Sequence, residues 1–226
     1  MDNATRHKAQ LKQYFDTDGF ERWSAIYDGQ TELSSVRQTV REGHDEMLQY
    51  AVQWVLESHT TGTLLDAGCG TGLFSLQMAQ RGFNVTGVDI APRMVASATS
   101  SAQYANVHEN AHFMVGDVDT TTGTYDIAVC FDVLIHYPHG LFSKMVRHLA
   151  QRTKKTLLFT YAPYSNLLAT LHWVGGLFPK GQRRTEIKMI PDSDVAELIH
   201  SMGMTIKNQH RISRGFYHVT LLEATY

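Results

Sequence analysis

An acidic residue, a run of glycines and a second acid are the residues of this chain whose types and spacing could do chemistry. Asp66 precedes glycines at positions 68, 70 and 72, and Asp89 ends the apolar segment 85–89. Glycine lets a backbone turn tightly against a ligand. An acid that ends the following strand, roughly 20 residues further on, can accept hydrogen bonds from both hydroxyls of a ribose. The combination predicts a site for a nucleotide-type cofactor.

The details of the turn indicate which kind of cofactor it suits. A dinucleotide site has the pattern G-x-G-x-x-G, in which a pyrophosphate lies on a helix N-terminus. This chain has D-x-G-x-G-x-G instead, and leucine stands at position 73. The carboxylate of Asp66 would repel a phosphate, whereas it would attract a cationic amino group.

A simpler interpretation exists for each acid taken alone. Acids at strand ends often cap helices or turns, and Asp66, Asp89 or Asp117 could do only that. Three such acids in series with a glycine turn favour the cofactor site. Cys69 lies within the turn, where we expect a small side chain that fits sterically and not a nucleophile, because no histidine is near it in the sequence.

The elements that must position these residues read as alternating strands and helices. Short apolar runs near 63–65, 85–89, 112–115, 126–131 and 156–161 predict strands, with helices after the glycine turn and from Pro92. This alternation is typical of a parallel sheet flanked on both faces, whose ligands gather at the carboxyl ends of the strands. A helix over 192–202 and an antiparallel pair of strands, 204–210 and 215–224, are expected to close the sheet.

Helices are also predicted before the first strand, including one from about 34 to 57. With 226 residues, of which 43% are hydrophobic, the chain can bury one substantial core. We therefore expect a helical arm over residues 1–58 that covers the site, and a core over 59–226. The segment 163–188 is expected to be an insertion in that core. We expect this insertion to select the acceptor, the molecule that receives a group from the cofactor.

The composition favours a small acceptor. The formal net charge of −2 lacks the basic excess of a protein that grips many phosphates, so a nucleic-acid partner is disfavoured. The 163–188 insertion is apolar and aromatic with a basic end, which suits a flat apolar acid; a packed helical hairpin with a solvated basic end fits equally well. Both cysteines fall in predicted core elements and no apolar signal segment begins the chain, which indicates a reduced, cytoplasmic location.

Two further stretches extend the pattern to a family. Gly116-Asp117-Val118 and the run 125–132 follow in order, and with the turn and Asp89 they resemble class I S-adenosylmethionine-dependent methyltransferases over about 63–160. The outer segments narrow this resemblance. Segments 14–27, 41–44, 132–138 (Asp-Val-Leu-Ile-His-Tyr-Pro), 175–179 (Gly-Gly-Leu-Phe-Pro) and 214–217 are similar to the magnesium-protoporphyrin IX O-methyltransferases of chlorophyll and bacteriochlorophyll synthesis.

The resemblance implies a fold, a cofactor and a set of binding residues. The fold would be α/β, a Rossmann-like sheet that is mostly parallel with an antiparallel C-terminal strand, an N-terminal helical arm and an inserted helical lid. The cofactor would be S-adenosyl-L-methionine, which leaves as S-adenosyl-L-homocysteine, and no protein-bound metal is implied. The implied cofactor residues are Asp66, Gly68, Cys69, Gly70, Asp89, Ile90, Met94, Asp117, Val118, Phe131 and Asp132; the implied substrate residues are Tyr14, Trp23, Arg183, Arg184 and Arg214.

The implied reaction esterifies one propionate of magnesium-protoporphyrin IX. A propionate, like a Glu side chain, has a pKa of about 4.3, so at neutral pH it is already the nucleophilic carboxylate. The resemblance assigns catalysis to Tyr27 and His136, each of which could donate a hydrogen bond to that carboxylate. From the residues alone, Tyr27 reads as a packed aromatic and His136 as a loop histidine satisfied by backbone. Axial ligation of the porphyrin magnesium by His136 is weaker, because Mg²⁺ prefers oxygen ligands.

Two other functions fit the core motifs. One is a methyltransferase that acts on a quinone or an amine, and the other is a non-catalytic tetrapyrrole carrier. The resemblance also suggests a magnesium chelatase or a cyclase as protein partner. The apolar insertion suggests peripheral association with photosynthetic membranes.

Overall fold

The computed structural model describes residues 3–27, 33–164 and 187–226. The predicted insertion, with its helical lid, therefore lies largely outside the described residues. In chain order the elements are α1 (Asn3–Phe15), α2 (Asp18–Tyr27), α3 (Ser35–Ser58), β1 (Gly62–Ala67), α4 (Leu73–Ala79), β2 (Phe83–Asp89), α5 (Pro92–Tyr104), β3 (Ala111–Val115), η1 (Val118–Thr120), β4 (Tyr125–Cys130), η2 (Leu134–His136), α6 (His139–Arg152), β5 (Thr153–Pro163), β6 (Met189–Ile190), α8 (Asp192–Ser201), β7 (Thr205–Arg214) and β8 (Tyr217–Thr225).

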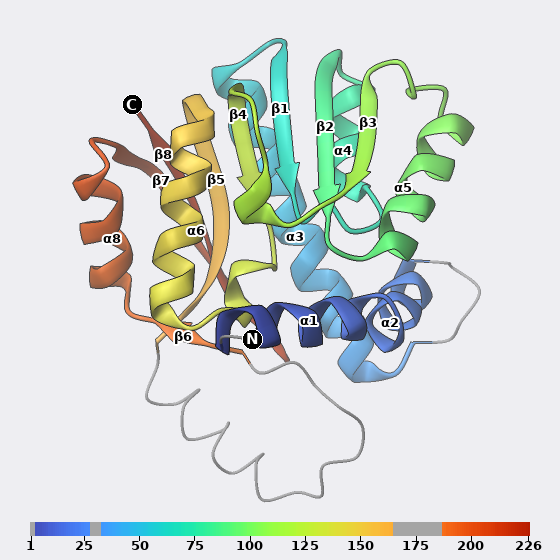
Figure 1. Ribbon diagram of the computed structural model, residues 1–226, viewed down its shortest axis with the longest axis horizontal. Coiled ribbons are helices and arrows are strands. Elements are labelled where there is room, and N and C mark those ends of the chain that lie inside the picture. Colours follow the sequence, from blue (N-terminus) through green and yellow to red (C-terminus); the bar gives the residue numbers. More distant parts are fainter. Residues whose placement is uncertain (1–2, 28–32, 165–186) are drawn as a thin grey trace, which may run out of the picture.

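The strands form one sheet in the order β3-β2-β1-β4-β5-β8-β7, with the short β6 beside β5 (Figure 1). The pairs β1–β2, β2–β3, β1–β4 and β4–β5 are parallel. Strand β8 runs antiparallel to both β5 and β7. The mostly parallel sheet with an antiparallel C-terminal strand is therefore confirmed.

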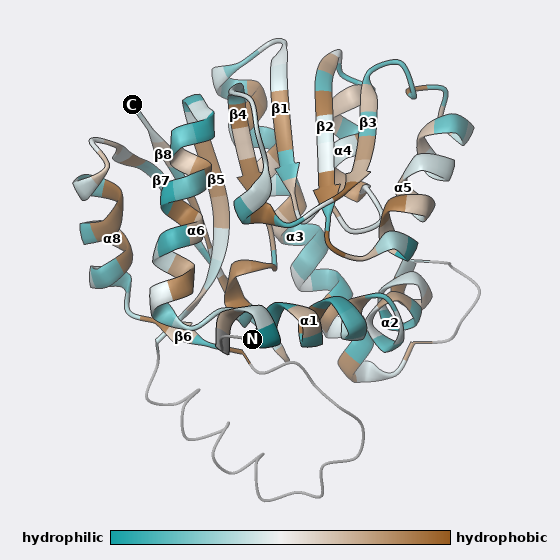
Figure 2. Cartoon of the chain, in the orientation of Figure 1, coloured by the Kyte–Doolittle hydropathy of each residue, from teal (hydrophilic) through white to brown (hydrophobic). Residues whose placement is uncertain are grey.

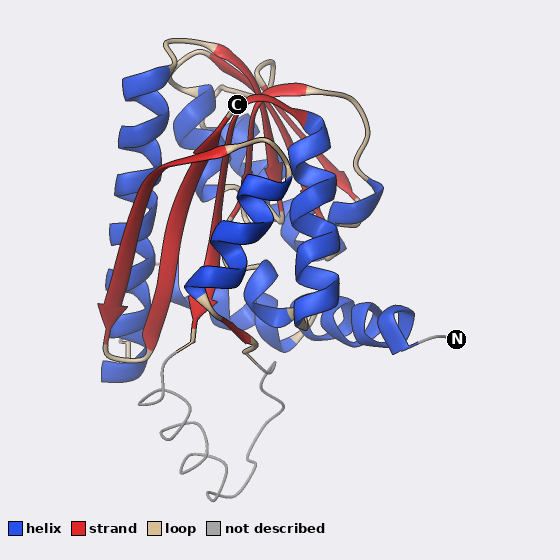
Figure 3. Ribbon diagram, turned by 90° about the vertical axis from the view of Figure 1, so that its left-hand side faces the viewer, coloured by secondary structure: helices blue, strands red, loops and turns tan. Residues whose placement is uncertain are grey.

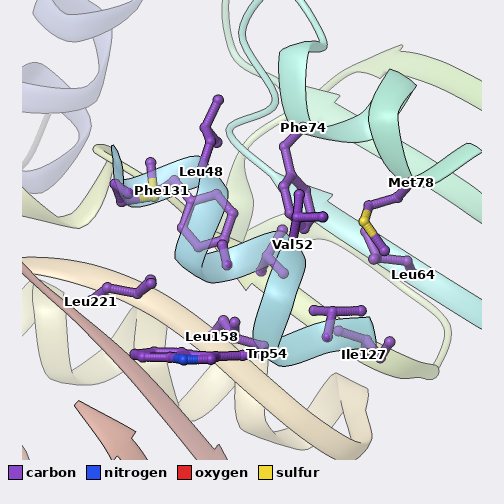
Figure 4. Close-up of a cluster of buried hydrophobic side chains, with 14 of the residues drawn as sticks. Leu48, Val52, Trp54, Leu64, Phe74, Met78, Ile127, Phe131, Leu158 and Leu221 are labelled. Atoms are coloured by element: carbon purple, nitrogen blue, oxygen red, sulfur yellow. The ribbon is translucent and has the colours of Figure 1, made fainter. Parts of the chain in front are cut away.

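Helices cover both faces of this sheet, as the side view shows (Figure 3). The apolar residues are concentrated on the strands and on the sheet-facing sides of the helices, and the outer helix surfaces are hydrophilic (Figure 2). On one face, α3 and α4 pack on the strands around Leu64, Ile127 and Leu158, with Trp54 and Phe74 in the same cluster (Figure 4). On the other face, α6 and α8 pack on a second cluster that includes the fully buried Phe159 and Tyr161.

Strand β7 is longer than expected, because it runs to Arg214 and the hairpin turn is confined to 215–216. Its side chains alternate between exposed and partly buried, and Ile212 is its single buried residue. Polar side chains such as Lys207 and Gln209 therefore occupy a paired strand. A prediction from apolar residues alone gives too short a strand here.

The helices before the first strand fall into two positions. Helices α1 and α2 lie across the carboxyl ends of the parallel strands (Figure 1). Helix α3, whose N-cap Ser34 accepts a hydrogen bond from the backbone N–H of Arg37, packs against β7, β8 and α4. Its residues Met47, Ala51 and Val55 are completely buried in the core. The expected domain boundary at residue 58 stays a prediction. Helix α3 precedes this boundary in the sequence and nevertheless contributes side chains to the core. None of the helices in the described ranges is long and apolar enough to span a membrane.

Candidate functional site

A cavity lies between the carboxyl ends of β1, β2 and β4 and the helices α1 and α2. Its wall combines the glycine turn after β1 with the loops after β2, β3 and β4 and with apolar side chains from the N-terminal helices. The residues that line it are Leu11, Phe15, Trp23, His44, Leu48, Asp66, Gly68, Cys69, Gly70, Thr71, Leu73, Phe74, Asp89, Ile90, Met94, Gly116, Asp117, Val118, Phe131, Asp132, Val133, His136 and Tyr137. Every residue that the sequence analysis assigns to the cofactor is on this wall.

The glycine turn needs glycine for two separate reasons. Gly68 has a φ of +85°, and a Cβ on it would come within 2.1 Å of Val133 Cγ2. Gly72 is the N-cap of α4 with a φ of +84°. A side chain at either position would strain the turn, because L-residues rarely adopt this conformation. Cys69 lies between the glycines, and burial raises the pKa of its thiol well above the ordinary value, so the sulfur stays protonated.

Asp66 ends β1 inside the wall and is only 2% exposed. The hydroxyl of Ser75, on α4, donates a hydrogen bond of 2.6 Å to its Oδ2. Burial raises the pKa of the Asp66 carboxyl to about 7, against the lowering effect of the Ser75 hydrogen bond. A cation placed beside this carboxyl would favour its ionised form, because a nearby opposite charge lowers the pKa of an acid.

Asp89 is held at the end of β2 by two backbone donors. The N–H of Gly70 donates to Oδ2 at 3.0 Å, and the N–H of Ala91 donates to Oδ1 at 2.8 Å. Burial raises the pKa of this carboxyl, and the backbone hydrogen bonds lower it. Each oxygen keeps capacity for a further hydrogen bond, so both remain available to a pair of hydroxyls.

The loop after β3 joins the wall to the N-terminal helix. Asp117 caps η1, and its Oδ2 lies 2.9 Å from the ammonium of Lys8 on α1. The same ammonium is 2.6 Å from Oδ2 of Asp119. These ion pairs hold α1 against the cavity, where Leu11 and Phe15 complete the wall.

Asp132 follows β4 in a left-handed conformation, with a φ of 56°. The hydroxyl of Tyr217 donates to its Oδ2 at 2.8 Å and that of Thr160 to its Oδ1 at 3.1 Å. Burial raises its pKa, and His44 and these hydroxyls lower it. Nε2 of His44 lies 4.0 Å from Oδ2 of Asp132.

The two residues expected to act on the acceptor are placed differently. His136, in η2, lines the cavity, and its ring packs at 5.4 Å from that of Phe15. Its backbone carbonyl is hydrogen-bonded to Nε2 of His7 at 2.8 Å. Tyr27 does not line the cavity; its hydroxyl is hydrogen-bonded to Nδ1 of His44, which does.

The residues expected to bind the substrate are only partly brought together. Trp23 lines the cavity and packs at 5.2 Å from the ring of His44. Tyr14 is not on the wall; its ring packs against Phe15, and its hydroxyl accepts a hydrogen bond of 3.3 Å from Arg22. Arg214 is also absent from the wall, because Glu46 holds its exposed guanidinium at 2.7 Å. Arg183 and Arg184 lie outside the described residues.

Sequence reasoning did not single out His44, which lies on the cavity wall. It lies in the segment 41–44 that carries part of the family resemblance. The position of a histidine on an amphipathic helix does not predict which residues of other elements it contacts. No set of three or more His, Cys, Asp or Glu side chains within the described ranges is placed to hold a metal ion.

Comparisons with known proteins show which proteins the chain is similar to. A family model described as a methyltransferase domain matches residues 64–156, and one described as the magnesium-protoporphyrin IX methyltransferase C-terminus matches residues 130–226. The magnesium-protoporphyrin O-methyltransferase of Synechocystis sp. is 36% identical over 220 residues, which are 96% of this chain and 95% of the relative. The chain belongs to the magnesium-protoporphyrin IX methyltransferase family.

A further relative and a solved structure support membership of this family. The magnesium-protoporphyrin O-methyltransferase of Rhodobacter capsulatus is 33% identical over 95% of this chain and 94% of its own length. The crystal structure of magnesium protoporphyrin IX methyltransferase from Synechocystis PCC 6803 with bound SAH matches with a TM-score of 0.87 and 35% identity, over 96% of this chain and 99% of the other. The predicted class I methyltransferase fold of this family member is confirmed.

Proposed function

We propose that this protein transfers the methyl group of S-adenosyl-L-methionine to a propionate carboxylate of magnesium-protoporphyrin IX. The products are the monomethyl ester and S-adenosyl-L-homocysteine, in chlorophyll or bacteriochlorophyll biosynthesis. The similarity to a magnesium-protoporphyrin O-methyltransferase over 96% of the chain carries the proposal, because it includes both the cofactor core and the acceptor-facing segments. The cavity is consistent with it, since acids and apolar side chains line the same space.

Each acid of the wall has a separate task toward the cofactor. Asp66 would bind the cationic amino group, and Asp89 both ribose hydroxyls. Asp117 and Val118 would border the adenine, together with Ile90 and Met94. The turn at Gly68, Cys69 and Gly70 would follow the backbone of the methionine moiety, with Phe131 and Asp132 near the reacting end.

The reaction itself needs positioning more than acid–base chemistry. A lone pair of the carboxylate oxygen forms the new O–C bond, and the C–S bond breaks with its electrons left on sulfur. The carboxylate is ionised at neutral pH, so no proton has to be removed. The protein must desolvate the carboxylate, align one oxygen with the C–S axis at about 3–3.5 Å from the methyl carbon, and exclude water.

Two side chains are proposed to act on the acceptor. His136 would donate a hydrogen bond that fixes the carboxylate at the cavity wall. Tyr27 would act from α2, and in the present arrangement its hydroxyl reaches the cavity through His44. Trp23 and Tyr14 would border the porphyrin, while Arg214 and the arginines at 183 and 184 remain proposed partners of the second propionate.

The acceptor is proposed to enter between the N-terminal arm and the insertion 163–188. Both described ends of that insertion are anchored near the site. The N–H of Lys188 donates to the carbonyl of Ile135 at 2.7 Å, and the N–H of Tyr164 donates to the carbonyl of Ile190 at 3.0 Å. Ile135 lies in η2 beside His136. The C-terminal end of the insertion is therefore attached to the same short helix that carries His136, the residue proposed to donate a hydrogen bond to the acceptor carboxylate.

The protein's surroundings follow from its substrate. Magnesium-protoporphyrin IX is large and apolar, so we propose peripheral contact with photosynthetic membranes and transfer from a magnesium chelatase or to a cyclase. Co-sedimentation with vesicles that contain the porphyrin, compared with vesicles without it, tests the membrane contact. No sedimentation with either kind of vesicle would contradict it.

The decisive experiment is an assay with matched acceptors. The purified protein is incubated with S-adenosyl-L-methionine and either magnesium-protoporphyrin IX or metal-free protoporphyrin. The products are separated by chromatography and identified by mass spectrometry. We expect the monomethyl ester from the magnesium compound. Binding of both ligands without transfer would indicate a carrier, and transfer only to a quinone or an amine would identify another small-molecule methyltransferase.

A further inference from the structure

His44 lies between the cavity and the residue expected to act on the acceptor. Its side chain is 12% exposed and lines the cavity, whereas Tyr27 is behind it on α2. Its ring also packs edge-on against that of Tyr217, on β8, and near that of Trp23. Two elements besides its own helix, α2 and β8, therefore fix the orientation of this imidazole.

The two nitrogens of His44 have different surroundings. Nδ1 is hydrogen-bonded to the hydroxyl of Tyr27. Nε2 is 4.0 Å from Oδ2 of Asp132, which is too long for a hydrogen bond. The Nε2 side, next to a second residue of the cavity wall, is thus the side on which the imidazole can take a ligand.

The partners also decide which nitrogen carries the proton. The carboxylate of Asp132 favours a proton on the nearer nitrogen, Nε2. Nδ1 then carries no hydrogen and accepts a hydrogen bond from the Tyr27 hydroxyl. Asp45 Oδ1, at 3.2 Å, is a second acceptor for that hydroxyl, but the Asp45 side chain is 42% exposed and paired with Arg41, so water competes for it. Both arguments lead to a neutral imidazole with an N–H at Nε2.

We propose that His44 is a catalytic hydrogen-bond donor, which presents Nε2–H to the acceptor carboxylate, and that Tyr27 and Asp132 are positioning residues that set its tautomer. The assignment rests on the proposed function, since the acceptor is a carboxylate only there. Burial lowers the pKa of His44, which keeps the imidazole neutral near pH 7. A neutral donor holds a carboxylate oxygen with less loss of nucleophilicity than an imidazolium would cause, because it draws less charge from the reacting atom.

The support behind Asp132 fits this role. A Cβ on Gly43 would come within 2.4 Å of the Tyr217 ring, so glycine at this position lets Tyr217 pack directly on α3. Tyr217 can then donate its hydroxyl to Asp132, and Thr160 donates a second hydrogen bond. These donors offset the charge of Asp132, which would otherwise repel an acceptor carboxylate in the same cavity.

The test compares substitutions that place an amide N–H on one or the other side of the ring. The amide nitrogen of Gln reaches about as far as Nε2, and that of Asn about as far as Nδ1. We expect His44→Gln to keep most of kcat/KM for the porphyrin. His44→Asn and His44→Leu should lose about 10- to 100-fold, the effect of one hydrogen bond to a charged group. Their affinity for S-adenosyl-L-homocysteine should be unchanged, and His210→Gln, at a histidine that stacks on Tyr50 of α3 away from the cavity, is the matched control.

A double-substitution cycle separates tautomer control from direct contact. An amide has no tautomers, so Tyr27→Phe should lower kcat/KM by about 10-fold in the protein with His44 and have little effect in the His44→Gln background. An equal loss in both backgrounds would mean that Tyr27 contacts the acceptor itself and would overturn the proposal. Wild-type activity of His44→Leu would overturn it too.

A spectroscopic readout does not depend on turnover. In ¹⁵N NMR spectra of histidine-labelled protein, His44 should have its proton on Nε2, and Tyr27→Phe or Asp132→Asn should shift the population toward Nδ1. A proton on Nδ1 in the wild type would contradict the inference even if the ester forms. Absence of ester from the wild type, with the Nε2 tautomer present, would instead contradict the proposed function and leave only the tautomer control.

Discussion

Asp66 should make cofactor binding depend on pH. Its folded pKa of about 7 lies above the unfolded value of 3.8, so the folded protein without cofactor binds this proton more tightly than the unfolded chain does. Its contribution to stability is therefore complete below about pH 3.8 and is lost as the pH rises toward 7. Binding of a cationic amino group requires the ionised carboxylate, so cofactor affinity should change in the opposite direction.

Calorimetric titration with S-adenosyl-L-homocysteine between pH 5 and 8 measures this effect. We expect affinity to increase with pH and to level off above about 7. Asp66→Asn should bind more weakly at pH 8 and lose the part of the pH dependence that is centred near 7. If Asp66→Asn shows the same pH dependence as the wild type, the amino group is bound elsewhere.

Asp89 and His136 should separate cofactor binding from turnover. Asp89→Ala removes both proposed ribose acceptors, so affinity for S-adenosyl-L-homocysteine should fall by about 10-fold or more, in line with the loss of charge-assisted hydrogen bonds. His136→Ala should leave that affinity nearly intact and lower kcat. Titration calorimetry and initial rates on the same preparations distinguish the two. Normal turnover in His136→Ala would remove it from the mechanism.

The sequence predicts single residues of the site where the chemistry is local. The glycines at 68 and 72 and the acid at 89 belong to continuous strand–turn–helix segments, and their spacing alone places them at one end of the sheet. The pairing of Tyr27 with His44, and of Tyr217 with Asp132, depends on how α2, α3 and β8 pack in space. No periodicity in the sequence records such pairings, so His44 was missed.

Gly43 sets how closely α3 can approach β8. In a helix, Gly→Ala normally stabilises by about 1 kcal/mol. Here the new Cβ would come within 2.4 Å of the Tyr217 ring, and overpacking of this kind costs about 1–3 kcal/mol. We therefore expect Gly43→Ala to lower the midpoint of urea unfolding and to lower turnover, because the Tyr217 hydroxyl is displaced from Asp132.

Gly140→Ala is the control for this substitution. Gly140 also lies in a helix, α6, and a Cβ there meets nothing within 4 Å. It should be neutral or slightly stabilising in the same urea titration. A stabilised Gly43→Ala would show that Tyr217 can move without cost.

The same comparison of local and spatial information applies to whole elements. Helix α3 was expected over 34–57 and spans Ser35–Ser58, because its apolar spacing and its Ser34 cap are local signals. Strand β5 was expected over 156–161 but extends over Thr153–Pro163. Its added residues pair with neighbouring strands, Thr153 with Tyr125 and Pro163 with Ile190, and those partners are distant in the sequence.

Truncation tests whether the N-terminal arm and the core are separated at residue 58. Helices α1 and α2 cover the cavity, so a protein that lacks residues 1–33 should lose only the helical signal of these two helices, keep a cooperative unfolding transition and bind S-adenosyl-L-homocysteine more weakly. A protein that lacks residues 1–58 also loses Met47, Ala51 and Val55 from the core. We expect it to unfold, because three buried side chains contribute several kcal/mol, about as much as a domain's net stability. A folded 59–226 fragment would support the boundary expected at residue 58.

The anchors of α1 also determine when it can dock during folding. His7 bonds to a carbonyl 129 residues further along the chain, and Lys8 pairs with Asp117 and Asp119. During synthesis α1 must therefore wait for the 129 residues that separate His7 from its partner before its binding surface exists, with Leu11 and Phe15 exposed in the meantime. We expect these long-range contacts to form after the folding transition state. Loosening them, for example with Lys8→Met, should accelerate unfolding while leaving the refolding rate nearly unchanged.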